Sequence, residues 1–285
     1  MYKKIFPYAL FLIIFSVVSF VVYDGEMVIE NEFDVGSYNI EKDDIEINES
    51  ESINIKDKDS QVKQSKKSQG FAGIAELERW RATTGMSSDQ DDLYSSYDIE
   101  TLLKLAVQGD TTAMVLSSDY HFVKGDIKQA HAMAYQAAAR GSNRALLLMA
   151  SRAKNALLFL EKGYYTKEYV KERFAIPDDL DASLVLSRLA LSHYAVAAIR
   201  GDVAHAKEFM ELFQLRYRDG KPFSQDEWAL VQGDANSIYR SLLDTRQQLG
   251  LTSFDNNYPE HYAYLHDLPE TNNNPLGYLE QQLVK

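Results

Sequence analysis

Four short segments in which alanine precedes glycine recur along the chain at regular intervals. They are Ala106-Val-Gln-Gly109, Ala138-Ala-Arg-Gly141, Ala198-Ile-Arg-Gly201 and Ala229-Leu-Val-Gln-Gly233. Gly109 and Gly141 are 32 residues apart, and so are Gly201 and Gly233, with 60 residues between the two pairs. A fixed period in this range is typical of helical solenoids, whose units stack on one another. The spacing therefore predicts the architecture before any motif suggests a chemistry.

Each signature carries the residues that end one helix and begin the next. Glycine suits the left-handed turn at a helix end because it has no Cβ, and the Asp or Ser that follows can cap the next helix. Gly125-Asp126 has the same form, and Gln129 stands at the spacing of a capping box. Ser224 and Glu227 repeat that spacing. The alternative is that Gly-Asp pairs mark ordinary helix ends in an irregular helical protein. The equal spacings and the preceding alanines favour repeats.

Two stretches resemble a known repeat family. The first is Gly125-Asp126…Ala130…Ala137-Ala138…Gly141…Ala145, and the second is Tyr194…Ala197-Ala198…Gly201-Asp202, with an aromatic residue seven positions before the glycine. Both resemble the Sel-one-like repeat, a relative of the tetratricopeptide repeat, over about residues 102–145 and 184–210. The resemblance implies units of two antiparallel helices and a role in binding partners or scaffolding complexes.

The chain departs from the family pattern in two places. The residues between Gly141 and Gly201 are irregular, and Ala145 has no counterpart at His205 or Ser237. The number of true repeats therefore stays open. We predict an all-α fold, in which antiparallel helix-pair repeats form a short irregular α-solenoid over residues 71–250.

The apolar periodicity gives the bounds of these helices. After an amphipathic helix around Trp80 that ends near Gly85, and another that begins after Asp98, we expect helices at about 110–123, 127–140, 142–161, 166–174, 180–200, 202–218 and 224–249. For the last of these helices, the sequence leaves open the alternative of a break near Gly233. Residues 251–285 read as a loop-like C-terminal tail, rich in Asn and Pro. Four of its apolar residues are candidates for docking on the last helices: Tyr258, Tyr262, Tyr264 and Leu265.

The N-terminus predicts a membrane anchor in residues 1–23. Lys3 and Lys4 precede an uncharged apolar run from Ile5 to Tyr23, which is just long enough to cross a bilayer as a helix. The lysines before it and the acids after it place the N-terminus in the cytoplasm and the remaining chain on the far side. In a bacterium with two membranes, this is a single-pass inner (cytoplasmic) membrane protein with a periplasmic domain. A cleaved signal, which would give a secreted binding protein, is the alternative.

Residues 24–70 read as a disordered spacer between this anchor and the helical domain. Eleven acids and one base, Lys42, lie in residues 24–55, and residues 56–70 are polar, with several Lys and Ser. A segment with high charge and few apolar groups buries too little apolar surface to offset the conformational entropy lost on folding. The alternation around Ile45 and Ile53 leaves open a strand on a partner's sheet edge. The spacer's expected role is to hold the folded domain away from the membrane.

Composition excludes several classes of function. The net charge is −12, which argues against a nucleic-acid partner, and the absence of cysteine excludes disulfides, thiolate metal sites and thiol nucleophiles. The six histidines form no metal-binding spacing, and His205 with Glu208 is a single helical pair. We find no phosphate-binding loop, dinucleotide fingerprint or nucleophile elbow. The prediction is a protein that is not an enzyme, with no catalytic residues, no cofactor and no metal site.

The expected function is a protein–protein interaction or scaffold module that binds another envelope protein. Tyrosine is abundant, with 18 residues, and core packing accounts for most of them. Tyr120, Tyr135 and Tyr194 are the candidate partner-binding residues, because tyrosine contributes a large contact area at low entropic cost. The alternative from another class is an envelope hydrolase with a site in the irregular region 161–181.

Overall fold

The computed structural model describes residues 19–23, 26–30, 73–87, 93–94, 96–269 and 271–284. The chain divides into two units, Met1–Asp59 and Ser60–Lys285. In the first unit, strand β1 (Ser19–Tyr23) pairs with strand β2 (Glu26–Glu30) in an antiparallel hairpin. Ser19 lies opposite Glu30, and Tyr23 lies opposite Glu26.

This hairpin differs from two predictions. Strand β1 takes the last five residues of the segment expected to be a membrane helix, and β2 lies in the segment expected to be a disordered spacer. The β-branched and aromatic residues of Phe20-Val-Val-Tyr23 favour a strand, and Asp24-Gly25 is a typical hairpin-turn sequence. The other residues of both segments lie outside the described part of the chain, so the membrane helix and the spacer stay predictions.

The second unit consists of helices packed together, which confirms the all-α class. Residues 73–83 form the first helix. The others are α4 (Ile99–Val107), α5 (Thr111–Lys124), α6 (Ile127–Arg140), α7 (Asn143–Glu161), α8 (Lys167–Phe174), α9 (Ala182–Ile199), α10 (Val203–Tyr217), α11 (Gln225–Gln248), α12 (Glu260–Leu265) and α13 (Pro275–Leu283). The bounds predicted between residues 110 and 249 agree with α5 to α11 within two residues at each end.

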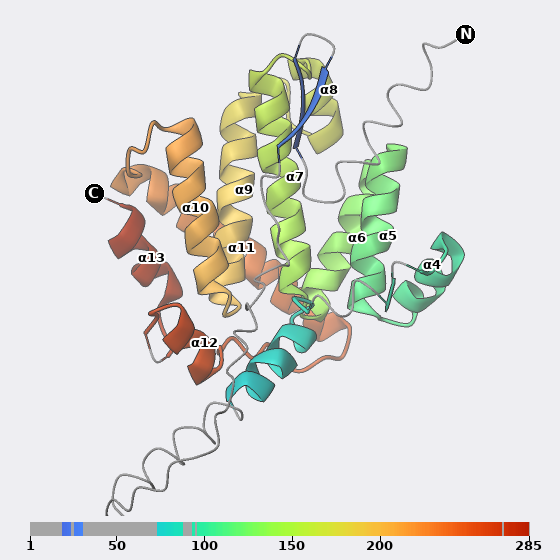
Figure 1. Ribbon diagram of the computed structural model, residues 1–285, viewed down its shortest axis with the longest axis vertical. Helices are drawn as coiled ribbons and strands as arrows, with labels where there is room; N and C mark the ends of the chain where they lie inside the picture. The colour runs from blue at the N-terminus through green and yellow to red at the C-terminus, as the bar shows by residue number, and fades with distance from the viewer. Residues whose placement is uncertain are drawn as a thin grey trace, which may run out of the picture. The chain divides into compact units, whose positions relative to one another are not determined.

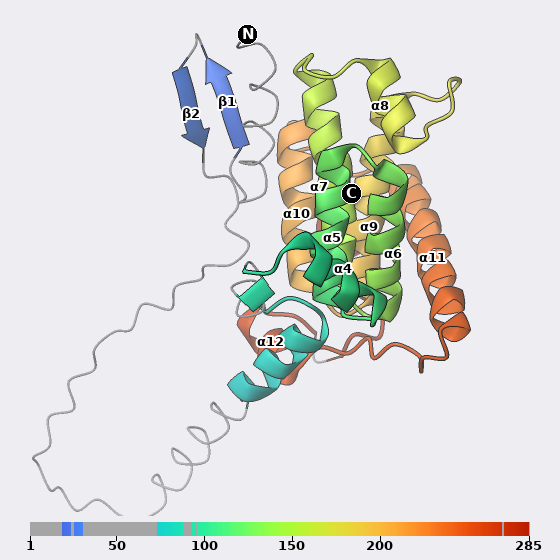
Figure 2. The same ribbon diagram turned by 90° about the vertical axis from the view of Figure 1, so that its right-hand side faces the viewer.

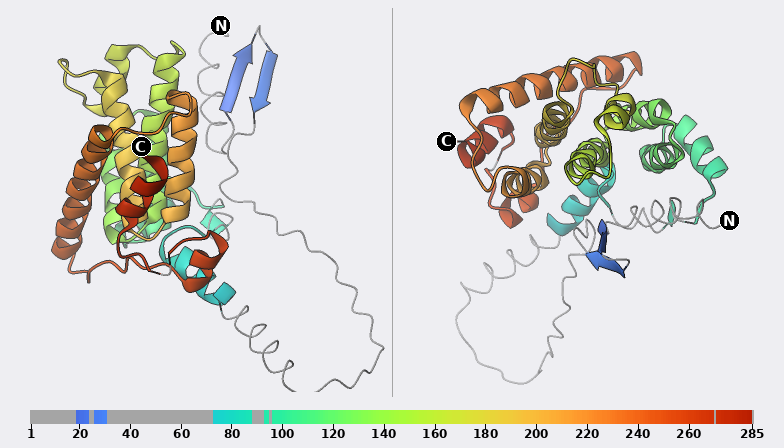
Figure 3. Two further views of the ribbon diagram at one scale, coloured as in Figure 1. Left: turned by 90° about the vertical axis from the view of Figure 1, so that its left-hand side faces the viewer. Right: turned by 90° about the horizontal axis from the view of Figure 1, so that it is seen from above.

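The helices pack as neighbouring antiparallel pairs (Figures 1 and 2). Helix α5 lies beside α6, α7 lies along α9, and α10 covers another side of α9. Helix α11 crosses this row and contacts both α9 and α6 (Figure 3). Small side chains allow the close approach, since many buried positions are alanine, among them Ala130, Ala134, Ala137, Ala138, Ala190, Ala195, Ala197 and Ala198.

Helix α9 is the one helix among the described residues that is long and apolar enough to cross a membrane. It lies at the centre of the bundle, in contact with α7, α10 and α11, and most of it is buried. Its apolar character is therefore explained by its place in the core of the helical unit.

Most of the glycine signatures end helices as predicted. Gly109, Gly125, Gly141 and Gly201 all have φ between +85° and +122°, the region that favours glycine. The residue after three of these glycines caps the next helix: Asp110, Asp126 and Ser142 accept a hydrogen bond from a backbone N–H three residues later. One dipeptide thus ends a helix and begins its neighbour.

The signature at Gly233 is the exception. Gly233 lies inside α11, which continues without a break from Gln225 to Gln248, so the alternative of a break near Gly233 is wrong. The helix has already started at Ser224, which forms a capping box with Glu227. Asp234 caps no helix; its carboxylate accepts hydrogen bonds of 3.0 and 2.8 Å from Arg188 of α9.

We expect Gly233→Ala to stabilise the protein by about 0.5–1 kcal/mol, because glycine inside a helix costs backbone entropy. A Cβ at this position meets no atom within 4 Å. Urea unfolding followed by circular dichroism measures the change. Gly201→Ala is the matched control and is expected to destabilise, since φ is +93° and the new Cβ would lie 3.1 Å from the Asn256 carbonyl oxygen. A destabilising Gly233→Ala would contradict the prediction.

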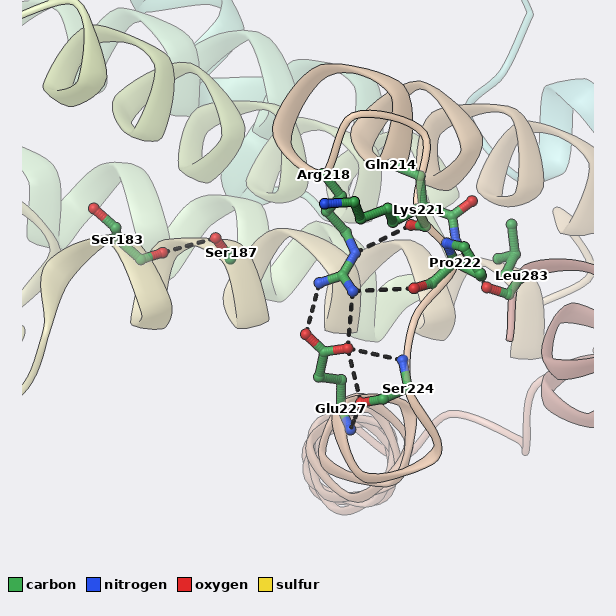
Figure 4. Close-up of polar contacts among 9 residues, drawn as sticks. All are labelled: Ser183, Ser187, Gln214, Arg218, Lys221, Pro222, Ser224, Glu227 and Leu283. Atoms are coloured by element: carbon green, nitrogen blue, oxygen red, sulfur yellow. Dashed lines mark hydrogen bonds and ion pairs between the residues drawn. The ribbon is translucent and has the colours of Figure 1, made fainter. Parts of the chain in front are cut away.

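The C-terminal segment belongs to the helical unit, which corrects the expectation of a loop-like tail. It contains α12 and α13, and α13 packs against α9 and α10. The Leu283 carbonyl oxygen accepts a hydrogen bond from Gln214 Nε2 at 2.7 Å, and Figure 4 shows both residues. It also accepts one from the Phe223 amide at 3.0 Å. Of the four residues expected to dock, Tyr258 and Tyr262 are buried, whereas Tyr264 and Leu265 are exposed.

An ion pair holds the turn between α10 and α11 beside this segment. The Arg218 guanidinium donates to both carboxylate oxygens of Glu227, at 2.6 and 3.0 Å, and to the Pro222 carbonyl oxygen at 3.0 Å (Figure 4). Arg218 lowers the pKa of Glu227 to about 2. The Glu227 carboxylate therefore stays ionised, and its ion pair with Arg218 is kept, across the ordinary pH range.

Candidate partner-binding surface

The candidate surface lies around the segment that interrupts the 32-residue spacing of the glycines. The 59 residues between Gly141 and Gly201 contain the long helices α7 and α9, and between these two α8 with its flanking loops. Helix α8 lies at the end of the bundle opposite α12 (Figure 1). Residues 162–181 are the part of this segment that lies between the two long helices.

Aromatic side chains gather where α7 passes into α8. We call Phe159, Tyr164, Tyr165 and Tyr169 the aromatic cluster. The Phe159 and Tyr165 ring centroids are 5.1 Å apart, and those of Tyr165 and Tyr169 are 4.7 Å apart. Tyr164 contacts Phe159 at 6.0 Å and is 59% exposed, and Tyr169 is 38% exposed. Burial raises the pKa of Tyr165 to about 12, so its hydroxyl stays protonated. Within the aromatic cluster, Phe159 and Tyr165 thus pack together, and the rings of Tyr164 and Tyr169 are exposed.

Arg173 fixes the aromatic cluster to α5. Its Nη1 donates to the Tyr169 hydroxyl at 3.0 Å, and its Nη2 donates to the Phe122 carbonyl oxygen at 2.9 Å. The guanidinium also lies 4.2 Å from the centroid of the Phe122 ring. A planar guanidinium can make such stacking and hydrogen-bonding contacts together. Three contacts therefore hold Tyr169 and α8 in place.

A buried ion pair supports Phe122 from within the bundle. The Arg152 guanidinium lies 4.4 Å from the centroid of the same ring and donates to Asp119 at 2.7 Å. Arg152 is 6% exposed. Burial raises the pKa of Asp119 although Arg152 opposes this, and burial lowers the pKa of Arg152 although Asp119 opposes that. The charged form of each side chain is thus stabilised by the other.

Two histidines in the same region add no charge at neutral pH. Burial, with help from the Arg152 charge, lowers the pKa of His131 to about 4. Burial also lowers the pKa of His193, whose Nδ1 lies 2.7 Å from the Leu189 carbonyl oxygen. Across the residues that the structure describes, no three His, Asp or Glu side chains are grouped to hold a metal ion.

A hollow of about 430 Å³ lies along α8 and the loop after it, in the region of the hydrolase alternative. It is lined by Lys167, Glu168, Lys171, Glu172, Ile176 and Asp178. Hydrogen bonds from its own backbone amide and from Thr166 lower the pKa of Glu168, whereas a general acid needs the opposite shift. Glu161, whose pKa is raised by burial, does not line the hollow. The hollow offers charged groups for contact beside the aromatic cluster.

The three tyrosines singled out from the sequence lie in different surroundings. Tyr120, on α5, is 40% exposed, with the Lys124 ammonium 5.6 Å from its ring. Tyr135 donates its hydroxyl proton to Ser241 at 2.6 Å, which joins α6 to α11. Tyr194 is fully buried and stacks on Phe209, with centroids 4.9 Å apart. Tyr194 as a partner-binding residue is therefore wrong, because α10 covers it.

The exposed residues Tyr164 and Tyr169, together with Arg173, were not predicted as site residues. A signal for them exists in the sequence, since Tyr164, Tyr165 and Tyr169 are concentrated in the segment that interrupts the period. Tyr120 lies two residues before Phe122, whose ring and carbonyl group contact Arg173. The three predicted tyrosines do not form one surface.

A second polar cluster lies at the other end of the bundle. Asp202 does not cap α10 as predicted; its fully buried carboxylate accepts a hydrogen bond from the Tyr262 hydroxyl at 2.8 Å and contacts His205 Nδ1 at 2.7 Å. Burial would raise the pKa of Asp202, but His205 and Tyr262 hold it below its ordinary value. Asp202 in turn raises the pKa of His205. This cluster joins α12 to α10, so we assign it to the docking of the C-terminal segment.

Comparison of the chain with protein-family models, with curated proteins and with solved structures found no match in any of the three. The resemblance to the Sel-one-like repeat therefore rests on the residues of this chain.

Proposed function

We propose that the protein is a membrane-anchored helical-repeat module that binds another protein of the cell envelope. In this proposal the helix pairs form a short irregular α-solenoid of the Sel-one-like kind, carried on the periplasmic side by the N-terminal apolar run and the acidic spacer. The antiparallel helix pairs and the glycine-ended helices support the repeat. Lys3, Lys4 and the apolar run that begins at Ile5 support the anchor, although the last five residues of that run form strand β1.

The observation that carries the binding role is the pair of exposed tyrosines on the inserted segment. Tyr and Arg are enriched among the residues that dominate binding energy at interfaces. Tyr169 is already held by Arg173, and Tyr164 rests on Phe159, so binding orders few side chains. Such preorganisation raises affinity because less conformational entropy is lost.

We expect the double variant Tyr164→Ser, Tyr169→Ser to reduce partner capture about tenfold or more, since each ring contributes about 1–2 kcal/mol at an interface of this kind. The measurement is cross-linking in intact cells, followed by quantitative mass spectrometry of the captured proteins. Tyr264→Ser is the control, because Tyr264 is 81% exposed and lies on α12, at the other end of the bundle.

Equal capture by the double variant and by the Tyr264→Ser control would contradict this assignment of the surface. Circular dichroism must show the same helix content in both. Tyr120→Ala, measured in the same way, tests whether the end of α5 belongs to the contact surface.

A further inference from the structure

Helix α12 is held by side-chain contacts to α10 and to the first helix, residues 73–83, which lies beside it (Figures 1 and 2). The Tyr262 ring packs 4.8 Å, centroid to centroid, from that of Trp80. The Tyr262 hydroxyl donates to Asp202 at 2.8 Å and accepts from the Ala204 amide at 3.3 Å. A helix of six residues is too short to be stable alone, so α12 depends on these contacts.

The contacts form part of a group of titratable side chains, Asp202, His205, Tyr262 and His266, which we call the histidine cluster. The Asp202 carboxylate is fully buried; its Oδ1 lies 2.7 Å from His205 Nδ1, and its Oδ2 has no hydrogen-bond partner among the described residues. The His266 ring lies 6.3 Å from that of His205 and 4.6 Å from that of Tyr262, between centroids. A buried carboxylate needs a compensating charge. One protonated imidazole supplies it, so a second protonated imidazole would be in excess.

The surroundings of the two imidazoles decide which one carries the proton. The Asp202 carboxylate raises the pKa of His205 although burial opposes this, and Glu208 adds to the rise. Partial burial lowers the pKa of His266, and the charges on His205 and Arg81 lower it further, whereas Asp202 opposes the change. His205 therefore takes the first proton. The titratable and charged groups that face the two imidazoles are Arg81 from the first helix, Asp202 and Glu208 from α10, and Tyr262 from α12.

We propose that acid releases α12 from α10 and from the first helix, because His266 then takes up a proton beside the protonated His205. The Asp202 carboxylate is already balanced by His205, so the second imidazolium is repelled by His205 and by Arg81. Release lets water surround His266 and ends this repulsion. It also exposes the Tyr262 ring, which is 1% exposed when α12 is docked.

The direction of the pH dependence follows from the two pKa shifts. A group whose pKa is lowered by folding contributes stability that is complete above its ordinary pKa, about 6.5 for histidine, and is lost as the pH falls. His266 therefore makes the docking of α12 weaker in acid. His205, whose pKa is raised, contributes stability that is lost as the pH rises through its folded pKa. Docking is thus strongest near about pH 6.5.

A single cysteine on α12 measures the release. The chain has no cysteine, so Ala263→Cys introduces the only thiol, at a position that is 4% exposed. Its rate of reaction with a pyridyl disulfide reagent reports how often α12 is released. Tyr264→Cys, at the neighbouring position, which is 81% exposed, is the reference that corrects for the ionisation of the thiol. In the full-length protein, the rate at position 263 relative to the reference should rise about threefold or more between about pH 6.5 and about pH 5.

Histidine variants in the Ala263→Cys background test the cause. His266→Gln should remove the acid response, because the second imidazolium can no longer form. His205→Gln should weaken docking at about pH 6.5 and reduce the acid response, since the charge that repels the proton on His266 is gone. His261→Gln, on the same helix but outside the histidine cluster, is the matched control and should keep the full acid response.

The same acid response in His266→Gln as in its parent, or no acid response in the parent, would overturn the proposal. Ser117→Cys distinguishes the release of α12 from unfolding of the whole unit, because Ser117 lies on α5 and is fully buried. If that thiol became reactive over the same pH range, the whole unit would be unfolding and the proposal would be wrong. The aromatic cluster of α7 and α8 takes no part in this release, so the outcome is independent of the proposed function.

Discussion

Replacing Arg152 with methionine should destabilise the helical unit by about 3–5 kcal/mol, which is the usual cost of removing one partner of a buried ion pair. The substitution leaves the Asp119 carboxylate without the guanidinium that donates to it at 2.7 Å. It also removes the cation from the Phe122 ring, on which Arg173 rests. Urea unfolding of the purified protein, followed by circular dichroism, measures the free energy.

A double variant separates the charge effect from the packing effect. Arg152→Met combined with Asp119→Leu removes both charges, so we expect it to recover most of the lost stability. A single variant that costs less than about 1 kcal/mol, or a double variant no more stable than the single one, would show that the ion pair does not support α5 and α7 as described.

Tyr262→Ala should cost about 3–5 kcal/mol and release the C-terminal segment. The Tyr262 ring is 1% exposed, and its centroid lies 4.8 Å from that of Trp80. Its hydroxyl donates to the buried Asp202 carboxylate, which the alanine variant leaves with one partner fewer. Urea unfolding gives the free energy. Hydrogen exchange of residues 251–284 then shows whether the segment has been released.

Tyr262→Phe is the matched control, because it keeps the ring and loses only the hydroxyl. We expect it to cost about 1.5–3 kcal/mol, the range for hydrogen bonds to charged groups, with the segment still protected from exchange. If Tyr262→Ala left that protection unchanged, other contacts, such as Gln214 to Leu283, would be the ones that hold the segment.

Much of the helical fold could be predicted because helix ends are local events. A glycine with positive φ and a capping side chain are set by a few neighbouring residues, as at Gly141 and Ser142. The signature at Gly233 also has an alanine before the glycine, but at four residues rather than three, and Gly233 lies inside a helix that begins with the capping box at Ser224. Asp234 contacts Arg188 on another helix instead of capping.

The candidate surface was harder to predict, because exposure depends on which helices meet. Tyr194 and Tyr164 are both tyrosines in or beside helices, but α10 covers the first and leaves the second exposed. The docking of the C-terminal segment likewise depends on contacts over long sequence separations, such as Asp202 with Tyr262. Such contacts are visible only once the helices are assembled.

The contact between Trp80 and Tyr262 brings the first helix of the unit, residues 73–83, against α12 near the end of the chain. A mechanical load applied to the chain at residue 73 would therefore reach the contact between Trp80 and Tyr262 before it reached α4 or α5. The Thr84 carbonyl oxygen, bound to the Asn143 amide at 2.8 Å, would share the strain with the start of α7. A load that enters at residue 73 would thus be borne first by the contact between Trp80 and Tyr262 and by the start of α7.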